Sequence, residues 1–185
     1  MIKPDRVSGV DTRTISLISI FSALNFAIAL LNKFFLGGSH FIGVSIAHVT
    51  IDAIFCTALL IIVMKISNKP GVATLVGFMT GLLMMFSSAK GPAPIAWLLR
   101  GLVLDVIVFG LYRNKCMFLC YSLAAFLAFL SQTFVGKILY LSLFMPAKVW
   151  TTLTGTLFIP LVLIGSSLSV LGAYLAVKKI VPVIT

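Results

Sequence analysis

The chain has 185 residues, of which 61% are hydrophobic and only 10% are charged, and its mean hydropathy is +1.19. Soluble domains carry about 25% charged residues, so this composition predicts an all-α, polytopic membrane protein and excludes a soluble catalytic or nucleotide-binding domain. The net charge of +10 does not indicate a nucleic-acid partner, because the 14 Lys and Arg residues are spread through short connecting segments, as expected of charges at membrane borders.

A helix that crosses the bilayer core needs about 20 apolar residues, and six segments approach this length. We therefore expect a single integral membrane domain over residues 1–185, built as a six-transmembrane-helix bundle. The helices are predicted at residues 14–31, 41–64, 72–88, 95–112, 117–139 and 150–177. Pro160 predicts a break in the last helix, and residues 140–148 are predicted to form an outer loop or a short interfacial piece.

The positive residues predict the orientation of the bundle, because they concentrate on the cytoplasmic side of membrane proteins. With the N-terminus inside, the outer side carries only Lys33, Lys90 and Lys148. The cytoplasmic side then carries Lys3, Arg6, Arg13, Lys65, Lys69, Arg113, Lys115, Lys178 and Lys179. We expect a cell-membrane protein with both termini cytoplasmic and with a first helix that is retained, since no small-residue cleavage site follows it.

The first predicted helix carries small residues at a spacing of four, namely Ser19, Ala23 and Ala27. Such a stripe lets another helix approach closely. The partner helix could belong to this chain or to a separate subunit, and the pattern alone favours this chain. The last predicted helix has a similar stripe of Gly165, Ser169 and Ala173.

The second and fourth predicted helices carry ionisable residues inside apolar stretches. Counted from the outer ends at about 1.5 Å per residue, Asp52 and Asp105 lie roughly 15 Å deep. His48 shares a helix face with Asp52, and Arg100 lies above Asp105. Charged residues at this depth are costly and usually functional, so we expect a polar cluster that opens outward.

Arg100 is offset from Asp105 around its helix, so a partner across helices, such as Asp52, is expected instead. Two interpretations of these charges remain open. They could be ion pairs that fix the packing of the bundle, or they could bind a ligand. Two carboxylates near the midplane would suit a ligand with cationic or N–H donor groups.

Further polar and aromatic residues lie toward the outer ends of the predicted helices. Gln132 and Tyr140 could line the same cavity, while Lys137 has the position of a lysine that extends to the interface. Trp97 and Trp150 are expected by default to anchor the interface. The alternative is that they stack on a flat ligand.

The chain contains no phosphate-binding G-x-x-x-x-G-K-[ST] loop and no zinc-protease H-E-x-x-H sequence. It also lacks the cysteine spacing of a zinc site. We expect neither a metal nor a cofactor. Any uphill transport driven by ATP would need other chains to hydrolyse it.

Three local patterns resemble the S components of energy-coupling-factor (ECF) transporters. They are the Ala23-x-x-x-Ala27 pattern, the turn Lys69-Pro70-Gly71, and the stretch from Gly91-Pro92 through Leu99-Arg100-Gly101-Leu102 to Asp105 and Phe109. The last stretch is similar to the matching helix of the YkoE-like group, which is associated with hydroxymethylpyrimidine and thiamine. That group tends to have a glutamate where Asp105 stands, and Arg100 is a further departure.

The resemblance implies a substrate-binding membrane subunit rather than an enzyme. It would capture a vitamin or related micronutrient from outside, and Ala23 and Ala27 would face a coupling transmembrane subunit that two ATPase subunits drive. The substrate site would draw on His48, Asp52, Trp97, Arg100, Asp105, Gln132, Lys137, Tyr140 and Trp150. The alternatives are a small membrane enzyme that uses Asp52, Asp105 and His48, or a membrane scaffold.

Overall fold

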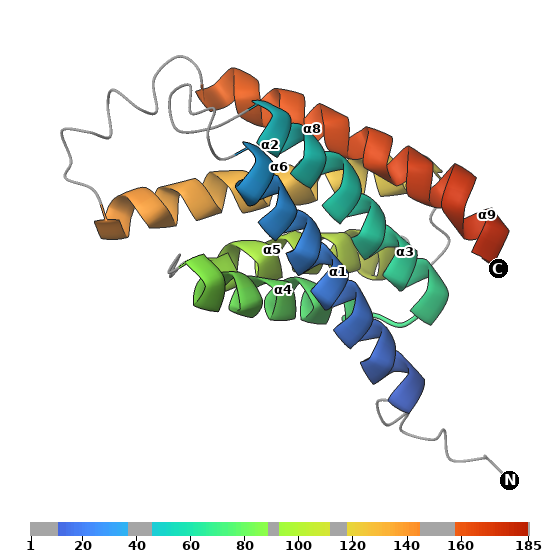
Figure 1. Cartoon of the computed structure of the whole chain (residues 1–185). Coiled ribbons are helices and arrows are strands. Elements are labelled where there is room, and N and C mark those ends of the chain that lie inside the picture. Colours follow the sequence, from blue (N-terminus) through green and yellow to red (C-terminus); the bar gives the residue numbers. More distant parts are fainter. Residues whose placement is uncertain (1–10, 37–45, 89–92, 112–117, 145–157, 185) are drawn as a thin grey trace, which may run out of the picture.

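The computed structural model describes residues 11–36, 46–88, 93–111, 118–144 and 158–184, and every regular element in these ranges is helical (Figure 1). Several of the helices continue directly into one another. In chain order they are α1 (Thr12–Leu36), α2 (Ile46–Ile51), the π-helical segment η1 (Asp52–Cys56), α3 (Thr57–Ser67), α4 (Val72–Ser88), α5 (Ala93–Asp105), the π-helical segment η2 (Val106–Leu111), α6 (Phe118–Phe144), α8 (Phe158–Tyr174), the π-helical segment η3 (Leu175–Ile180) and α9 (Val181–Ile184).

Five stretches of continuous helix in the described ranges are long and apolar enough to cross a membrane. They are Thr12–Asn32, Val49–Ser67, Ala93–Leu111, Phe118–Gly136 and Ile159–Ile180. The remaining helix, α4, has 17 residues and spans about 25 Å at 1.5 Å per residue. The hydrocarbon core is about 30 Å thick. The fold is thus all-helical with five helices of spanning length, and the expectation of six full spans is not confirmed.

The predicted helix boundaries agree with the structure at some places and differ at others. The predicted helix at 72–88 coincides with α4. Pro160 lies in the first turn of α8, where its missing N–H has no partner to lose; the predicted break before it falls at residues outside the described part of the chain and stays a prediction. The predicted loop at 140–148 is wrong in its first part, because α6 continues to Phe144.

A four-residue turn joins α3 to α4 and makes them antiparallel neighbours. Asn68 ends α3 in the left-handed conformation, with φ 49°, and its N–H donates to the carbonyl of Met64 at 2.9 Å. Gly71 also has a positive φ, 83°, which glycine adopts without a steric penalty. The sequence Asn68-Lys69-Pro70-Gly71 therefore forms a tight turn that positions the start of α4.

Helices α4 and α5 pack with their backbones in contact. A Cβ atom at Gly77 would overlap the carbonyl oxygen of Trp97, and one at Gly101 would overlap the carbonyl oxygen of Ala73. Small residues permit this approach in membrane bundles. The contact fixes α5, and with it Arg100, against the rest of the bundle.

Helix α1 packs with one face on α4 and on the α2–η1–α3 helix. In Figure 1 it crosses the front of the bundle, with its first turns far from the C-terminal end of α6 and the N-terminal end of α8. Of the five long helices it has the smallest buried share. Most of its surface is therefore left open to lipid or to another protein.

Candidate functional site

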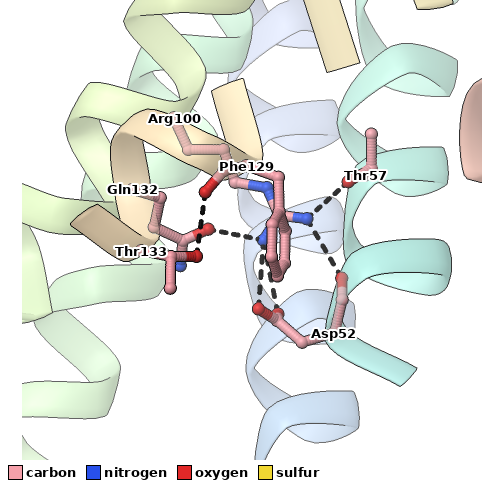
Figure 2. A network of polar contacts seen from close by, with 6 residues as sticks. All are labelled: Asp52, Thr57, Arg100, Phe129, Gln132 and Thr133. Carbon is pink, nitrogen blue, oxygen red and sulfur yellow. Dashed lines mark hydrogen bonds and ion pairs between the residues drawn. The ribbon is translucent and has the colours of Figure 1, made fainter. Parts of the chain in front are cut away.

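Arg100 lies at the centre of a polar network in the middle of the Ala93–Leu111 span (Figure 2). Its side chain is fully buried. One terminal nitrogen, Nη1, donates to the Asp52 carboxylate at 3.3 and 3.4 Å and to Oε1 of Gln132 at 2.7 Å. The other, Nη2, donates to the backbone carbonyl of Asp52 at 3.0 Å and to the hydroxyl of Thr57. The expected pairing of Arg100 with Asp52 is confirmed.

The π-helical segment η1 brings Asp52 and Thr57 to the same guanidinium. Five residues apart in a regular α-helix, they would differ by about 140° around the axis. A π-helical turn, whose hydrogen bonds run from i to i+5, brings residues five apart close to one face. The irregularity at Asp52–Cys56 is therefore what lets two side chains and a carbonyl of one helix serve one arginine.

Helix α8 supports this segment from outside. A Cβ atom at Gly172 would overlap the backbone carbonyl of Ile54, in the middle of η1. A residue larger than glycine at 172 would have to push η1 or α8 aside. Gly172 thus holds η1 in place although it touches none of the charged groups.

Two aromatic rings enclose the guanidinium. The Cζ atom of Arg100 lies 5.3 Å from the centroid of Trp97 and 5.2 Å from that of Phe129. These distances are within the range of cation–π attraction. The expectation that Trp97 anchors the interface by default is wrong, because Trp97 is only 6% exposed and covers Arg100.

The network is charge-balanced but incompletely bonded. Arg100 and Asp52 cancel, and Gln132 adds no charge. Nε of Arg100 is buried without a hydrogen-bond partner, while the Asp52 side chain is 20% exposed. The Asp52 carboxylate is therefore the group through which a polar molecule could reach the network.

Asp105 does not belong to this network, so the expected clustering of two carboxylates is wrong. Its Oδ2 accepts hydrogen bonds from the N–H of Thr74 at 2.8 Å and from the Thr74 hydroxyl at 2.6 Å. The first N–H groups of a helix have no partner within the helix, and Asp105 supplies one to α4. Five residues beyond Arg100, its side chain points about 140° away from it.

Four predicted site residues lie wholly or partly outside what the structure describes. His48 is in α2, and Lys137 and Tyr140 are in α6, but their side chains are outside the described part. Trp150 lies outside the described residues altogether. Their assignment to a substrate site stays a prediction.

The small-residue stripe of α1 faces away from the protein body. Ser19, Ala23 and Ala27 are all exposed, and the Ser19 hydroxyl donates to the carbonyl of Ile15 within its own helix. The favoured interpretation, a partner helix of the same chain, is therefore wrong for this stripe within the described residues. The corresponding stripe of α8, namely Gly165, Ser169 and Ala173, is buried inside the bundle.

Sequence reasoning missed Thr57 and Phe129. In a regular helix Thr57 would point away from Asp52, and no residue pattern signals the π-helical turn that brings the two together. Phe129 precedes Gln132 by three residues and so shares its face, which is a signal that could have placed it. The adjacent Thr133 bonds within α6, since its hydroxyl donates to the carbonyl of Phe129 at 2.9 Å.

Comparisons with protein-family models, with curated proteins and with solved structures find no match for this chain. The fold and the site alone define its class, an all-helical protein with helices of membrane-spanning length around a buried arginine–carboxylate network.

Among the residues the structure describes, no three His, Cys, Asp or Glu side chains gather as a metal site would require.

Proposed function

We propose that this chain is the substrate-capturing membrane subunit, the S component, of an ECF-type importer. The observation that carries the proposal is the network of Arg100, Asp52, Gln132 and Thr57 at mid-span. Charges at this depth cost roughly 2.5 to 3.5 kcal/mol each on insertion scales. A protein whose function needed only helix packing could reach the same fold with apolar residues at lower cost.

The geometry favours a small polar molecule as ligand. Since Arg100 and Asp52 neutralise each other, a ligand meets no net charge there. The partly exposed Asp52 carboxylate accepts hydrogen bonds from N–H or O–H donors. The rings of Trp97 and Phe129 pack on its partner, the Arg100 guanidinium. A vitamin or related micronutrient with a donor-bearing heterocycle fits, and thiamine and its hydroxymethylpyrimidine precursor are the first candidates.

The partner face is supported by the exposed stripe on α1. Ser19, Ala23 and Ala27 leave a shallow surface flanked by exposed Ile20 and Leu24. A helix of a coupling subunit can approach such a surface closely. In this arrangement two ATPase subunits supply the energy, both termini of this chain are cytoplasmic, and the ligand enters from the opposite side of the cell membrane.

A thermal-shift screen of the detergent-purified protein tests the proposal. Thiamine, hydroxymethylpyrimidine and other vitamins are compared, each in large excess. A ligand at 100 times its Kd stabilises the folded state by about 2.7 kcal/mol. We expect a clear shift with one compound and none with its close analogues. The absence of a shift across all vitamin classes would contradict the proposal.

A further inference from the structure

Two lysines are held against aromatic rings at the end of the bundle where α3 and η3 finish and α6 begins. The Lys65 ammonium lies 4.9 Å from the ring centroid of Tyr121. The Lys178 ammonium lies 5.1 Å from Phe118 and 5.7 Å from Tyr174. These five residues are here called the basic–aromatic cluster. They belong to four helical segments, α3, α6, α8 and η3.

The rings of the cluster form a fixed support for the lysines. Phe118 and Tyr174 meet edge to face, with centroids 5.9 Å apart, and Tyr121 is almost fully buried. Because Phe118 and Tyr121 are three residues apart on α6, they lie on one face of the helix. The two ammonium groups therefore flank a single turn of α6.

Neither lysine has an anionic partner in the part of the chain that the structure describes. The ion pair found there joins Arg100 to Asp52, and Asp105 is bonded to Thr74. Lys69, by contrast, donates to the Thr14 hydroxyl at 3.1 Å. A ring attracts an ammonium group without accepting its N–H bonds as an oxygen does, so Lys65 and Lys178 keep donors for an outside anion.

We propose that the basic–aromatic cluster binds the phosphate of an anionic phospholipid. Basic pockets between the ends of transmembrane helices hold such head groups, and a helix end of spanning length lies at head-group depth. The exposed leucines of α6 that follow the cluster support a lipid rather than a free anion. Leu119, Leu123 and Leu127 recur every four residues and are 79%, 47% and 38% exposed, which gives an acyl chain an apolar path.

The test is a titration of the purified full-length protein with short-chain phosphatidylglycerol, followed by native mass spectrometry. Phosphatidylcholine with the same acyl chains is the comparison lipid. We expect the double variant Lys65→Gln/Lys178→Gln to lose about thirtyfold in affinity for phosphatidylglycerol and to bind phosphatidylcholine as before. The variant Lys65→Arg/Lys178→Arg, which keeps both charges and the ring contacts, should retain binding.

The matched control is Arg13→Gln/Lys179→Gln, which removes two exposed positive charges outside the cluster. This control should keep its affinity within about twofold. An equal loss in the control and in the lysine pair would overturn the proposal, because it would show a general charge effect. Displacement of the lipid by millimolar inorganic phosphate would also overturn it, because the site would then recognise a free anion.

Discussion

A single residue, Arg100, connects three helices in the middle of the span. Its fork of donors reaches Asp52 and Thr57 on the second spanning helix and Gln132 on α6. Lysine offers one compact ammonium and could not reach the same acceptors at once. The burial of this charge is tolerable only because nearly all its donors are bonded and its counter-ion is adjacent.

Replacement of Arg100 by Met should lower the free energy of unfolding by about 3 to 5 kcal/mol, because it leaves the Asp52 carboxylate without a counter-ion. The double variant Arg100→Met/Asp52→Leu removes both charges and should recover most of this loss. Thermal or denaturant unfolding in detergent measures both. If the loss of stability in the double variant equalled the sum of the losses in Arg100→Met and Asp52→Leu, the pair would not be coupled.

Asp105 has a separate role, and its removal should affect stability alone. Asp105→Ala deprives the N–H of Thr74 of its acceptor, and the loss of a helix cap costs about 0.5 to 2 kcal/mol. Asp105→Asn, which keeps an acceptor oxygen, should cost less. We expect ligand affinity to stay unchanged in both variants by calorimetry. A tenfold weaker affinity with unchanged stability would contradict this role and would indicate that Asp105 binds the ligand.

The sequence predicted part of this site and could not predict the rest. The pairing of Arg100 with Asp52 follows from a buried charge, an offset around the helix and a carboxylate at equal depth. The depth of Asp105 along its helix does not reveal that its carboxylate meets the free backbone N–H of Thr74 at the start of α4. Thr57 was out of reach because its approach depends on the π-helical turn at Asp52–Cys56.

At the scale of helices, the shape of η1 depends on its contact with α8. Gly172→Ala places a methyl group against the carbonyl of Ile54 and should shift the acceptors of Arg100. We expect a loss of stability of about 1 to 3 kcal/mol and a weaker ligand affinity. Gly110→Ala is the matched control, since a Cβ there meets only Val106, at an ordinary 3.9 Å. Equal behaviour of the two variants would contradict the role of Gly172.

The exposed stripe of α1 should matter for assembly and not for ligand binding. Ala23→Trp adds bulk on an exposed face of α1. We expect unchanged ligand affinity, but loss of uptake and of co-purification with a coupling subunit. Phe86→Trp, on a 79% exposed position of α4, is the matched control. Normal uptake by the Ala23→Trp protein would remove α1 as the partner face.

The helices were easier to predict than their ends. Each of the six apolar runs contains helix in the described part of the chain, since an apolar segment satisfies its backbone hydrogen bonds internally when it is helical. The runs did not reveal that α4 stops short of a full span, or that α6 continues to Phe144. Which face of α1 is free was also beyond the pattern, since small residues suit internal and external partners equally.

At the scale of the whole molecule, three features lie in different places. The charged network is at mid-span, and the small-residue stripe runs along the outside of α1. Apart from Arg100, the basic residues whose side chains the structure describes lie at one end. These are Arg13, Lys65, Lys69, Lys178 and Lys179. The positive-inside rule favours a cytoplasmic position for this end, which agrees with the proposed orientation.

The most direct test of the account is the affinity of the Asp52→Asn protein for the compound that stabilises the wild type, measured by calorimetry. Asn keeps the size of the side chain but removes the charge that a ligand donor would meet. We predict a Kd at least tenfold higher, or about 1.4 kcal/mol, while Asp11→Asn, at an exposed carboxylate at the start of α1, leaves it unchanged. An unaltered Kd in the Asp52→Asn protein, with only its stability lowered, would show that the network packs helices and does not bind the ligand.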